Sequence, residues 1–156
     1  MKNLILLMGR SGSGKNYFAE QTGLDPVISY TTRPKRPGEV EGVEHYFVDD
    51  KFYQEFSKHY IVAYTHFNGY HYWASMKECN EKQVYIIDPA GVRYLKSTHP
   101  EIQVVVWYLD VPVETCIEHM RKRGDSNEDI KKRALHDESA FRGAKSLADV
   151  VLTWNK

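Results

Sequence analysis

The chain has 156 residues, of which 42% are hydrophobic and 13% aromatic, with 21 basic and 21 acidic side chains. This length suits one domain with a core and is too short for two ordinary ones. The balanced charge excludes a strong overall field for nucleic acid or an acidic membrane surface, so any anion site has to be local. The two cysteines lack metal-ligand spacing, and no apolar run approaches the roughly 20 residues of a membrane span. We therefore expect a cytoplasmic monomer or small homo-oligomer without nucleic-acid or membrane partners.

Buried strands and helices alternate along the chain. Five apolar runs are typical of strands that are covered on both faces of a parallel sheet: residues 4–8, 27–28, 84–87, 104–109 and 150–152. Helices are expected between them, at residues 15–22, 49–58, 90–98, 113–123 and 127–142. This alternation predicts an α/β fold with a central, mostly parallel five-stranded sheet between helical layers.

The middle of the chain departs from this alternation. Strand patterns at residues 61–67 and 70–73 flank Asn68-Gly69, the strongest short signal for a β-hairpin. The sequence therefore predicts a small antiparallel insert at about residues 33–81.

We expect the whole chain, residues 1–156, to form a single domain. Its core would consist of residues 1–32 and 82–156, with the insert emerging between them. Residues 121–133 carry charges of both signs around a glycine between two helices. This pattern predicts a short mobile lid, and a solvated helix connection is the alternative.

A glycine-rich loop joins the first strand to the first helix. It reads Gly9-Arg10-Ser11-Gly12-Ser13-Gly14-Lys15 and matches GxxxxGK in the strand–loop–helix context that binds phosphate. In such a loop the backbone N–H groups point inward, the helix N-terminus adds positive potential, and the lysine bridges the terminal phosphates. The sequence therefore predicts a three-layer P-loop NTPase fold, an ATP site at residues 9–16, and Lys15 as a catalytic residue.

The metal site is less regular. Asn16 follows the lysine, where the pattern has a serine or threonine whose hydroxyl binds Mg²⁺. An amide oxygen also binds hard cations, although its reach differs. Asp88 follows another buried strand and is the second candidate ligand. We expect Mg²⁺ to accompany ATP, held weakly by Asn16 and Asp88, directly or through water.

The segment after the first helix contains two arginines separated by a proline turn. Arg33 and Arg36 can present forked donors to a phosphate, and taken alone they are equally well surface charges. Here the pattern Ser-x-Thr-Thr-Arg-Pro-x-Arg-Pro-Gly-Glu-Val-x-Gly, which follows the phosphate loop, resembles the acceptor-binding region of guanylate kinases. The resemblance extends over about residues 3–153, through Phe67-Asn68-Gly69-Tyr70-His71-Tyr72, Asp88-Pro89-Ala90-Gly91-Val92, Arg123-Gly124 and Arg133.

The resemblance implies an ATP-dependent nucleoside monophosphate kinase with GMP or dGMP as the default acceptor. In that family the residues matching Arg33, Arg36 and Tyr72 hold the acceptor phosphate, and the serine matching Ser29 touches the base. The arginines matching Arg123 and Arg133 belong to the lid and contact the triphosphate or the transferring group. Catalysis would then depend on Lys15, Arg33, Arg123 and Arg133. Acceptor binding would depend on Ser29, Arg33, Arg36, His45, Tyr72 and Asp88.

Several family positions differ, and most of them concern the base. A phosphate-binding tyrosine aligns with His45, so its role passes to His45 or to Tyr46. Two carboxylates that contact guanine align with Ala63 and Ile86. A serine near the acceptor aligns with Ala74, and a glycine aligns with Trp73. Another nucleotide, with its base stacked on Trp73, Phe67 or His71, is therefore an alternative acceptor.

Two further alternatives remain open. Ribose 1,5-bisphosphate phosphokinases also lack the guanine-reading glutamate and have an Asn-Gly like Asn68-Gly69, although the segment 36–42 is closer to guanylate kinases. A binding module that keeps the fold without catalysis is the other alternative. Such modules tend to lose the phosphate loop, whereas Gly9, Gly14 and Lys15 are intact here.

Overall fold

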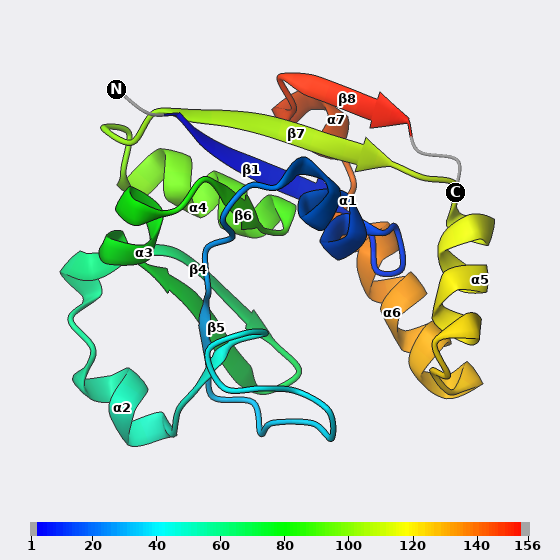
Figure 1. Ribbon diagram of the computed structural model, residues 1–156, viewed down its shortest axis with the longest axis horizontal. Coiled ribbons are helices and arrows are strands. Elements are labelled where there is room, and N and C mark those ends of the chain that lie inside the picture. Colours follow the sequence, from blue (N-terminus) through cyan, green and yellow to red (C-terminus); the bar gives the residue numbers. More distant parts are fainter. Residues whose placement is uncertain (1–2, 154–156) are drawn as a thin grey trace.

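The computed structural model describes residues 3–153, so the ends of the predicted domain, residues 1–2 and 154–156, lie outside the described residues. Its central sheet has the strand order β6-β1-β7-β8, and all three pairings are parallel (Figure 1). The strands are β1 (Leu4–Gly9), β6 (Val84–Ile86), β7 (Val104–Asp110) and β8 (Val150–Thr153). The predicted parallel α/β sheet is therefore confirmed.

The central sheet has four strands among residues 3–153, so the strand expected at residues 27–28 was wrong. Pro26 forms only an isolated parallel bridge with Val84, and the Val27 N–H donates to the Val84 carbonyl at 2.7 Å. The Val84 N–H donates to the Asp25 carbonyl at 3.1 Å, and beyond Val27 the Ile28 N–H donates to a carboxylate oxygen of Glu78 at 3.0 Å. The pairing therefore stops after one bridge.

Four helices lie within two residues of their predicted bounds: α1 (Lys15–Thr22), α4 (Pro89–Thr98), α5 (Val113–Lys122) and α6 (Asn127–Ala140). The helix expected at residues 49–58 is divided into α2 (Asp50–Glu55) and the 3₁₀ turn η1 (Lys58–Tyr60). Two short helices were not predicted, α3 (Met76–Glu81) and α7 (Ala144–Leu147). Side-chain caps begin four of these helices, because Asp49, Ser75, Asp88 and Ser126 each accept an N–H from the first turn.

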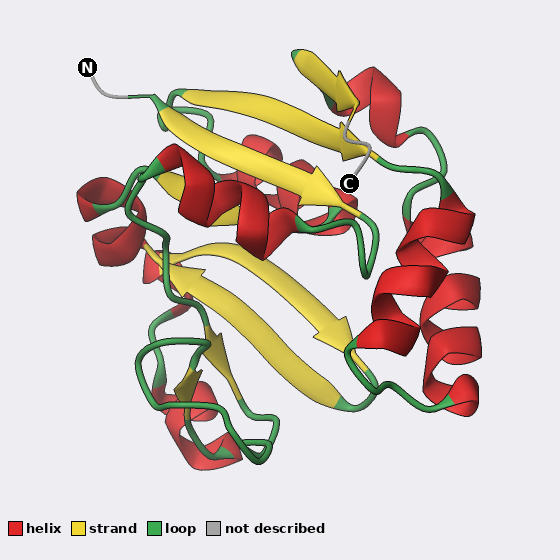
Figure 2. Cartoon of the chain, turned by 45° about the vertical axis from the view of Figure 1, so that its right-hand side comes forward, coloured by secondary structure: helices red, strands yellow, loops and turns green. Residues whose placement is uncertain are grey.

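The central sheet is covered on both faces, which gives the three layers (Figure 2). On one face Leu6, Met8 and Val106 pack with Val92 and Leu95 of α4. On the other face the packing includes Leu7, Leu109, Ala19 of α1 and Cys116 of α5. The carboxyl end of β1, where the glycine-rich loop begins, is therefore held between α1, α4 and α5.

The insert forms a second sheet with the order β3-β2-β5-β4. Its strands are β2 (Tyr30–Thr31), β3 (Tyr46–Phe47), β4 (Ile61–Phe67) and β5 (Tyr70–Ser75). The predicted hairpin is confirmed, with Asn68 at φ 53° and Gly69 at φ 83° in its turn. The sheet is mixed rather than antiparallel, because β2 pairs with β3 in parallel.

Candidate active site

The glycine-rich loop requires glycine at the points where it meets other backbone. A Cβ at Gly9 would lie 2.6 Å from the Ser13 hydroxyl oxygen, and one at Gly12 would lie 2.4 Å from the Cys116 carbonyl oxygen of α5. Gly14 has φ 90° immediately before α1. The Ser13 hydroxyl is buried within the loop and has no hydrogen-bond partner among residues 3–153. This closed loop at a helix N-terminus is suited to bind a phosphate chain.

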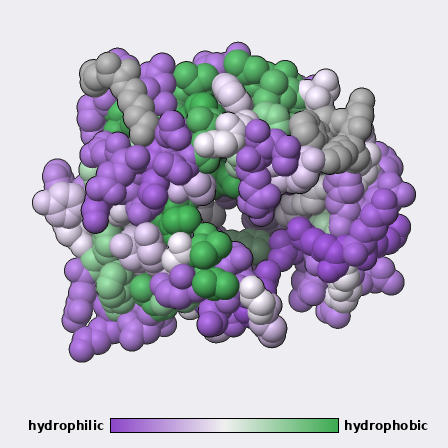
Figure 3. Space-filling view, viewed as in Figure 1, coloured by the Kyte–Doolittle hydropathy of each residue, from purple (hydrophilic) through white to green (hydrophobic). Residues whose placement is uncertain are grey.

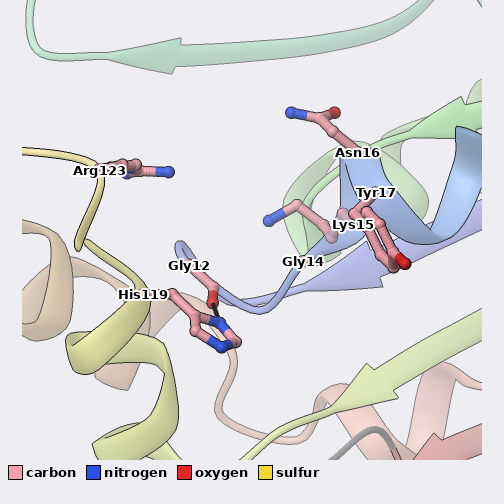
Figure 4. A pocket seen from close by; sticks show the side chains of 7 residues that line it. All are labelled: Gly12, Gly14, Lys15, Asn16, Tyr17, His119 and Arg123. Carbon is pink, nitrogen blue, oxygen red and sulfur yellow. Dashed lines mark hydrogen bonds between the residues drawn. The ribbon is translucent and has the colours of Figure 1, made fainter. Parts of the chain in front are cut away.

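A cavity of about 440 Å³ opens at this loop, and its lining brings α1 and α5 together (Figure 4). It is lined by Gly12, Gly14, Lys15, Asn16, Tyr17, His119 and Arg123. Lys15 and Arg123 extend toward each other from opposite sides of the cavity. Two predicted cationic groups, far apart in sequence, therefore lie at one site.

Lys15 is half-buried, and its ammonium group donates to the Arg10 carbonyl at 2.9 Å. Burial lowers the pKa of Lys15 from 10.5 to about 8, and the negative charge of Asp137 opposes that decrease. At pH 7 the side chain is charged while poorly solvated, which strengthens its attraction for an anion.

Residues of both α5 and α6 donate to or accept from the phosphate loop. The Ser11 N–H donates to a carboxylate oxygen of Asp137 in α6 at 2.8 Å. His119 of α5 donates from Nδ1 to the Gly12 carbonyl at 2.7 Å. Neither residue was predicted, because no local motif marks them and only the folded chain brings α5 and α6 to the loop.

Arg33, predicted to bind the acceptor phosphate, forms a bidentate ion pair with Glu39. Its two terminal nitrogens lie 2.8 and 3.0 Å from the two carboxylate oxygens, and Arg33 is only 9% exposed. The Arg36 N–H also donates to Glu39 at 2.7 Å. The pair closes the proline turn and fixes the direction of the Arg33 guanidinium plane.

Replacing Glu39 by glutamine should destabilise the protein in a pH-dependent manner. Hydrogen bonding from Arg33 lowers the pKa of Glu39 from 4.5 to about 2, so its stabilising effect is present above pH 4.5 and is lost as the pH falls toward 2. The difference in pKa corresponds to at most about 3 kcal/mol at pH 7. Urea unfolding of the variant should show this loss at pH 7 and a smaller loss at pH 3. The exposed Glu55→Gln is the matched control, and an equal loss at both pH values would contradict the account.

Three arginines from separate parts of the chain converge. Burial lowers the pKa of Arg133 on α6, and the charges of Arg123 and Arg36 lower it further. Arg123 is oriented by Asp125, with nitrogen–oxygen distances of 2.7 and 2.9 Å. The three like charges repel each other, so an anion among them would be strongly stabilised. Arg36 is exposed and belongs to the predicted insert, so predicted phosphate ligands from the insert and from the segment 121–133 lie close enough for their charges to interact.

Three of the remaining predicted acceptor residues, Ser29, His45 and Tyr72, lie together beside the second sheet. The Ser29 hydroxyl and His45 Nδ1 share a hydrogen bond of 2.9 Å, and the rings of His45 and Tyr72 are in edge contact at 5.8 Å. Burial and the nearby Arg33 lower the pKa of His45, so it is neutral at pH 7. Tyr46 instead donates its hydroxyl to Glu78 at 3.0 Å. Of the two candidates for the tyrosine role, the site therefore presents His45.

The positions that would read a guanine edge carry no carboxylate. Ala63 and Ala74 lie directly opposite each other on β4 and β5 and are 1% and 0% exposed. Ile86 packs with Leu7 and Ala19 on the other face of the central sheet. The base contacts expected from the family are therefore replaced by apolar packing.

The three aromatic residues that could stack on a base contact other aromatic rings of the protein. Trp73 is 0% exposed and stacks on Tyr30 at 5.3 Å, and His71 stacks on Tyr53 at 3.8 Å. Phe67 contacts His136 of α6 at 4.3 Å. The prediction that Trp73 stacks on a base was therefore wrong, because its ring is fully buried, whereas for His71 and Phe67 it stays a prediction.

Asp88 serves first as a structural cap. One carboxylate oxygen accepts the Gly91 N–H of α4 at 2.7 Å and the Thr65 hydroxyl at 3.1 Å. Asn16 is exposed at the start of α1. Between residues 3 and 153, no three His, Cys, Asp or Glu side chains are grouped so that they could hold a metal ion. The oxygen donors of Asn16 and Asp88 fit a cation whose other ligands come from phosphates and water.

The face of the molecule in Figure 3 is hollowed at its centre, and hydrophilic side chains border the opening on the side of α6. This polar border is consistent with a site for charged ligands between the central sheet, the insert and α6.

Within the described part of the chain, no helix is both long and apolar enough to cross a membrane.

Comparisons with known proteins identify relatives of this chain. The guanylate kinase family model matches residues 1–156. The guanylate kinase of Carboxydothermus hydrogenoformans is 32% identical over 139 residues, which cover 81% of this chain and 68% of that protein. The guanylate kinase of Prochlorococcus marinus (strain MIT 9312) is 33% identical over 147 residues, which cover 86% of this chain and 79% of the other.

A solved structure has the same fold. The crystal structure of guanylate kinase from Anaplasma phagocytophilum superposes with a TM-score of 0.66 at 21% identity, covering 99% of this chain and 78% of that one. The predicted family and the predicted class of ATP-dependent phosphotransferase are confirmed. The chain belongs to the guanylate kinase family.

Proposed function

We propose that the chain transfers the γ-phosphoryl group of ATP, with Mg²⁺, to GMP or dGMP in the cytoplasm, with little discrimination among bases. The observation that carries the proposal is the convergence of Arg36, Arg123 and Arg133, which complements the phosphate loop and Lys15. A donor cradle and a separate cluster of arginines are the two parts that phosphoryl transfer between anions requires. We assign the acceptor-binding role to residues 33–81 and the lid to residues 121–133.

At the donor side, the loop amides of residues 9–16 would hold the phosphates of ATP and Lys15 would neutralise their charge. Bound Mg²⁺ would supply further charge neutralisation at the β- and γ-phosphates. Asn16 would hold it through its amide oxygen, and Asp88 through water, because one Asp88 oxygen already caps α4.

At the acceptor side, Arg36 and Tyr72 would bind the phosphate of the acceptor, with Arg33 held in place by Glu39. Arg123 and Arg133 would stabilise the charge that develops on the transferring group. The attacking oxygen belongs to a phosphate that is already ionised, so no general base is needed. Positioning and charge neutralisation then account for catalysis.

The base should be read weakly. A carboxylate that binds the 2-amino group of guanine contributes about 1.5 to 3 kcal/mol, or roughly 10- to 200-fold in kcat/KM. Ala63 and Ile86 offer no such group. We therefore expect the kcat/KM for GMP to exceed that for IMP, which lacks the 2-amino group, by less than about 10-fold. A ratio above about 100 would show that another residue reads the guanine edge.

Replacing Asn16 by threonine should strengthen the use of Mg²⁺. A hydroxyl at this position is the usual ligand of phosphate-loop enzymes, and we expect the Mg²⁺ concentration for half-maximal activity to fall by about 3- to 10-fold. Titration of Mg²⁺ at fixed ATP measures this, with Asn16→Ala as the comparison, which should raise that concentration. Equal values for all three proteins would exclude Asn16 from the metal site.

The proposal is tested by an ATP-consumption screen with products identified by mass. The acceptors are GMP, dGMP, IMP, AMP, CMP, UMP, dTMP and ribose 1,5-bisphosphate. Turnover of GMP and dGMP supports the proposal. Turnover of ribose 1,5-bisphosphate alone would replace it, and ATP binding without turnover of any acceptor would indicate a binding module.

A further inference from the structure

A buried carboxylate lies behind the phosphate loop, outside the cavity that Lys15 and Arg123 line. Asp137 is 6% exposed and accepts the Ser11 N–H at 2.8 Å, across 126 positions of sequence. A buried charge is costly unless hydrogen bonds and opposite charges compensate it. Here the loop N–H and the positive charge of Lys15 supply that compensation.

Ser11 and its neighbour Arg10 both connect the phosphate loop to α6. Ser11 is at the outer end of the loop, whose own turn is closed by the Ser13 N–H donating to the Arg10 carbonyl at 3.0 Å. Beside it, the guanidinium of Arg10 lies over the ring of Phe141, the residue that ends α6, at 5.7 Å. The loop is therefore attached to the second half of α6 by two neighbouring residues (Figure 1).

Arg133 precedes Asp137 by four residues, about one turn, on the same helix. Residues at positions i and i+4 share one helix face, so Asp137 and Arg133 both face the loop side of α6. A rigid helical turn then links the Ser11–Asp137 hydrogen bond to the Arg133 guanidinium. Displacing that bond would displace Arg133 relative to Lys15.

The first lid helix has a contact of its own. His119 donates to the Gly12 carbonyl at 2.7 Å, and the backbone of α5 approaches Gly12 so closely that a Cβ there would collide with the Cys116 carbonyl. The loop is thus held between α5 and α6, and Asp137 provides the charged contact on the α6 side.

We propose that Asp137 is a positioning residue for phosphoryl transfer, which sets the placement of Arg133 relative to the phosphate loop through its hydrogen bond to Ser11. The inference rests on the proposed function for its kinetic consequence. In this role Asp137 contacts neither substrate. Loss of Asp137 should therefore lower kcat, which depends on alignment, and should change the KM for the acceptor little.

Kinetics of Asp137 variants test the proposal. Asp137→Ala should lower kcat by about 100-fold, the cost of a displacement near 1 Å, with KM for GMP changed by less than about 3-fold. Asp137→Asn should restore kcat to within about 5-fold of the unchanged protein, because an amide oxygen accepts the same N–H. The exposed neighbour Glu138→Ala is the matched control and should be unchanged.

A double-variant cycle separates positioning from general stability. In the Arg133→Ala background, Asp137→Ala should lower kcat by less than about 3-fold, since the group that it aligns is gone. Full multiplication of the two effects, an unchanged kcat in Asp137→Ala, or an Asn variant as impaired as the Ala variant would each overturn the proposal. If Asp137→Ala does not fold, Asp137→Glu replaces it, because the longer side chain keeps the charge and displaces the loop.

Hydrogen exchange distinguishes a failure of this inference from a failure of the proposed function. If the unchanged protein phosphorylates no acceptor, the proposed function is wrong and the inference is decided on the ATP complex. Asp137→Ala should then accelerate amide exchange in residues 9–15, while Asp137→Asn and Glu138→Ala should not. Equal exchange in all the proteins would overturn it.

Discussion

Replacement of Lys15 by alanine is expected to lower kcat/KM for phosphoryl transfer by about 10³-fold or more, the range found when a preorganised charged donor is removed from such a site. Lys15 is the cation of the phosphate loop, half-buried at the cavity that it shares with Arg123. No neighbouring side chain can reproduce a positive charge placed there by the loop itself. Steady-state kinetics with ATP and GMP measure the loss.

The same substitution should leave the fold intact. Burial lowers the pKa of Lys15 to about 8, so its charge is poorly solvated in the folded protein, and this cost offsets the favourable interaction of the charge with Asp137. We expect the thermal midpoint of Lys15→Ala to lie within about 4 °C of that of the unchanged protein, with the exposed Lys96→Ala as control. Turnover within 10-fold of normal would contradict the assignment of the phosphate loop.

Replacement of Arg133 by alanine is expected to lower kcat by about 10³-fold, comparable to the loss of a catalytic arginine in other phosphoryl-transfer sites. Arg133 is half-buried on α6 beside two other positive charges, an arrangement that favours a strongly anionic partner. Its main interaction should form with the charge that develops during transfer, so KM values for ATP and GMP should change by less than about 5-fold.

Two comparisons isolate this effect. Arg142→Ala, at an exposed position just after α6, should have normal kinetics, and Arg133→Lys should recover only part of the rate because it keeps the charge without the forked donors. Arg36→Ala should instead raise the KM for GMP. A similar increase in KM for Arg133→Ala, with kcat unchanged, would place Arg133 in ground-state binding.

Much of the central fold follows from local patterns. The strands at β1, β6 and β7 are continuous apolar runs, and the phosphate loop requires glycines at close backbone contacts that a sequence shows directly. The strand expected at residues 27–28 was wrong because a two-residue run forms no ladder of its own, and here the pairing stops at the bridge of Pro26, after which Glu78 accepts the Ile28 N–H.

The insert was harder to predict because tertiary contacts decide it. Strands β2 and β3 have two residues each and exist only through pairing with each other and with β5. Trp73 is an aromatic residue of the kind that stacks on a base. Side chains alternate between the two faces of β5, however, and Trp73 lies on the far face, where it packs on Tyr30. The face of the sheet on which a side chain lies could therefore be predicted only from the register of the hairpin.

In the site, residues inside motifs were predictable and their partners were not. Lys15, Arg36 and Arg123 carry recognisable patterns, whereas Asp137 reaches the loop only after α6 has packed. Arg33 and Glu39 are six positions apart in the sequence, but the bidentate geometry of their ion pair is set by the proline turn and the burial of Arg33.

The most direct test of the proposed reaction follows the label from [γ-³²P]ATP into product with GMP as acceptor. We expect the label to appear in the β-phosphate of GDP, in equal amount to the ADP formed, and this transfer to disappear in Lys15→Ala. Release of the label as inorganic phosphate at the same rate with and without GMP would contradict it, because the protein would then hydrolyse ATP without serving the acceptor.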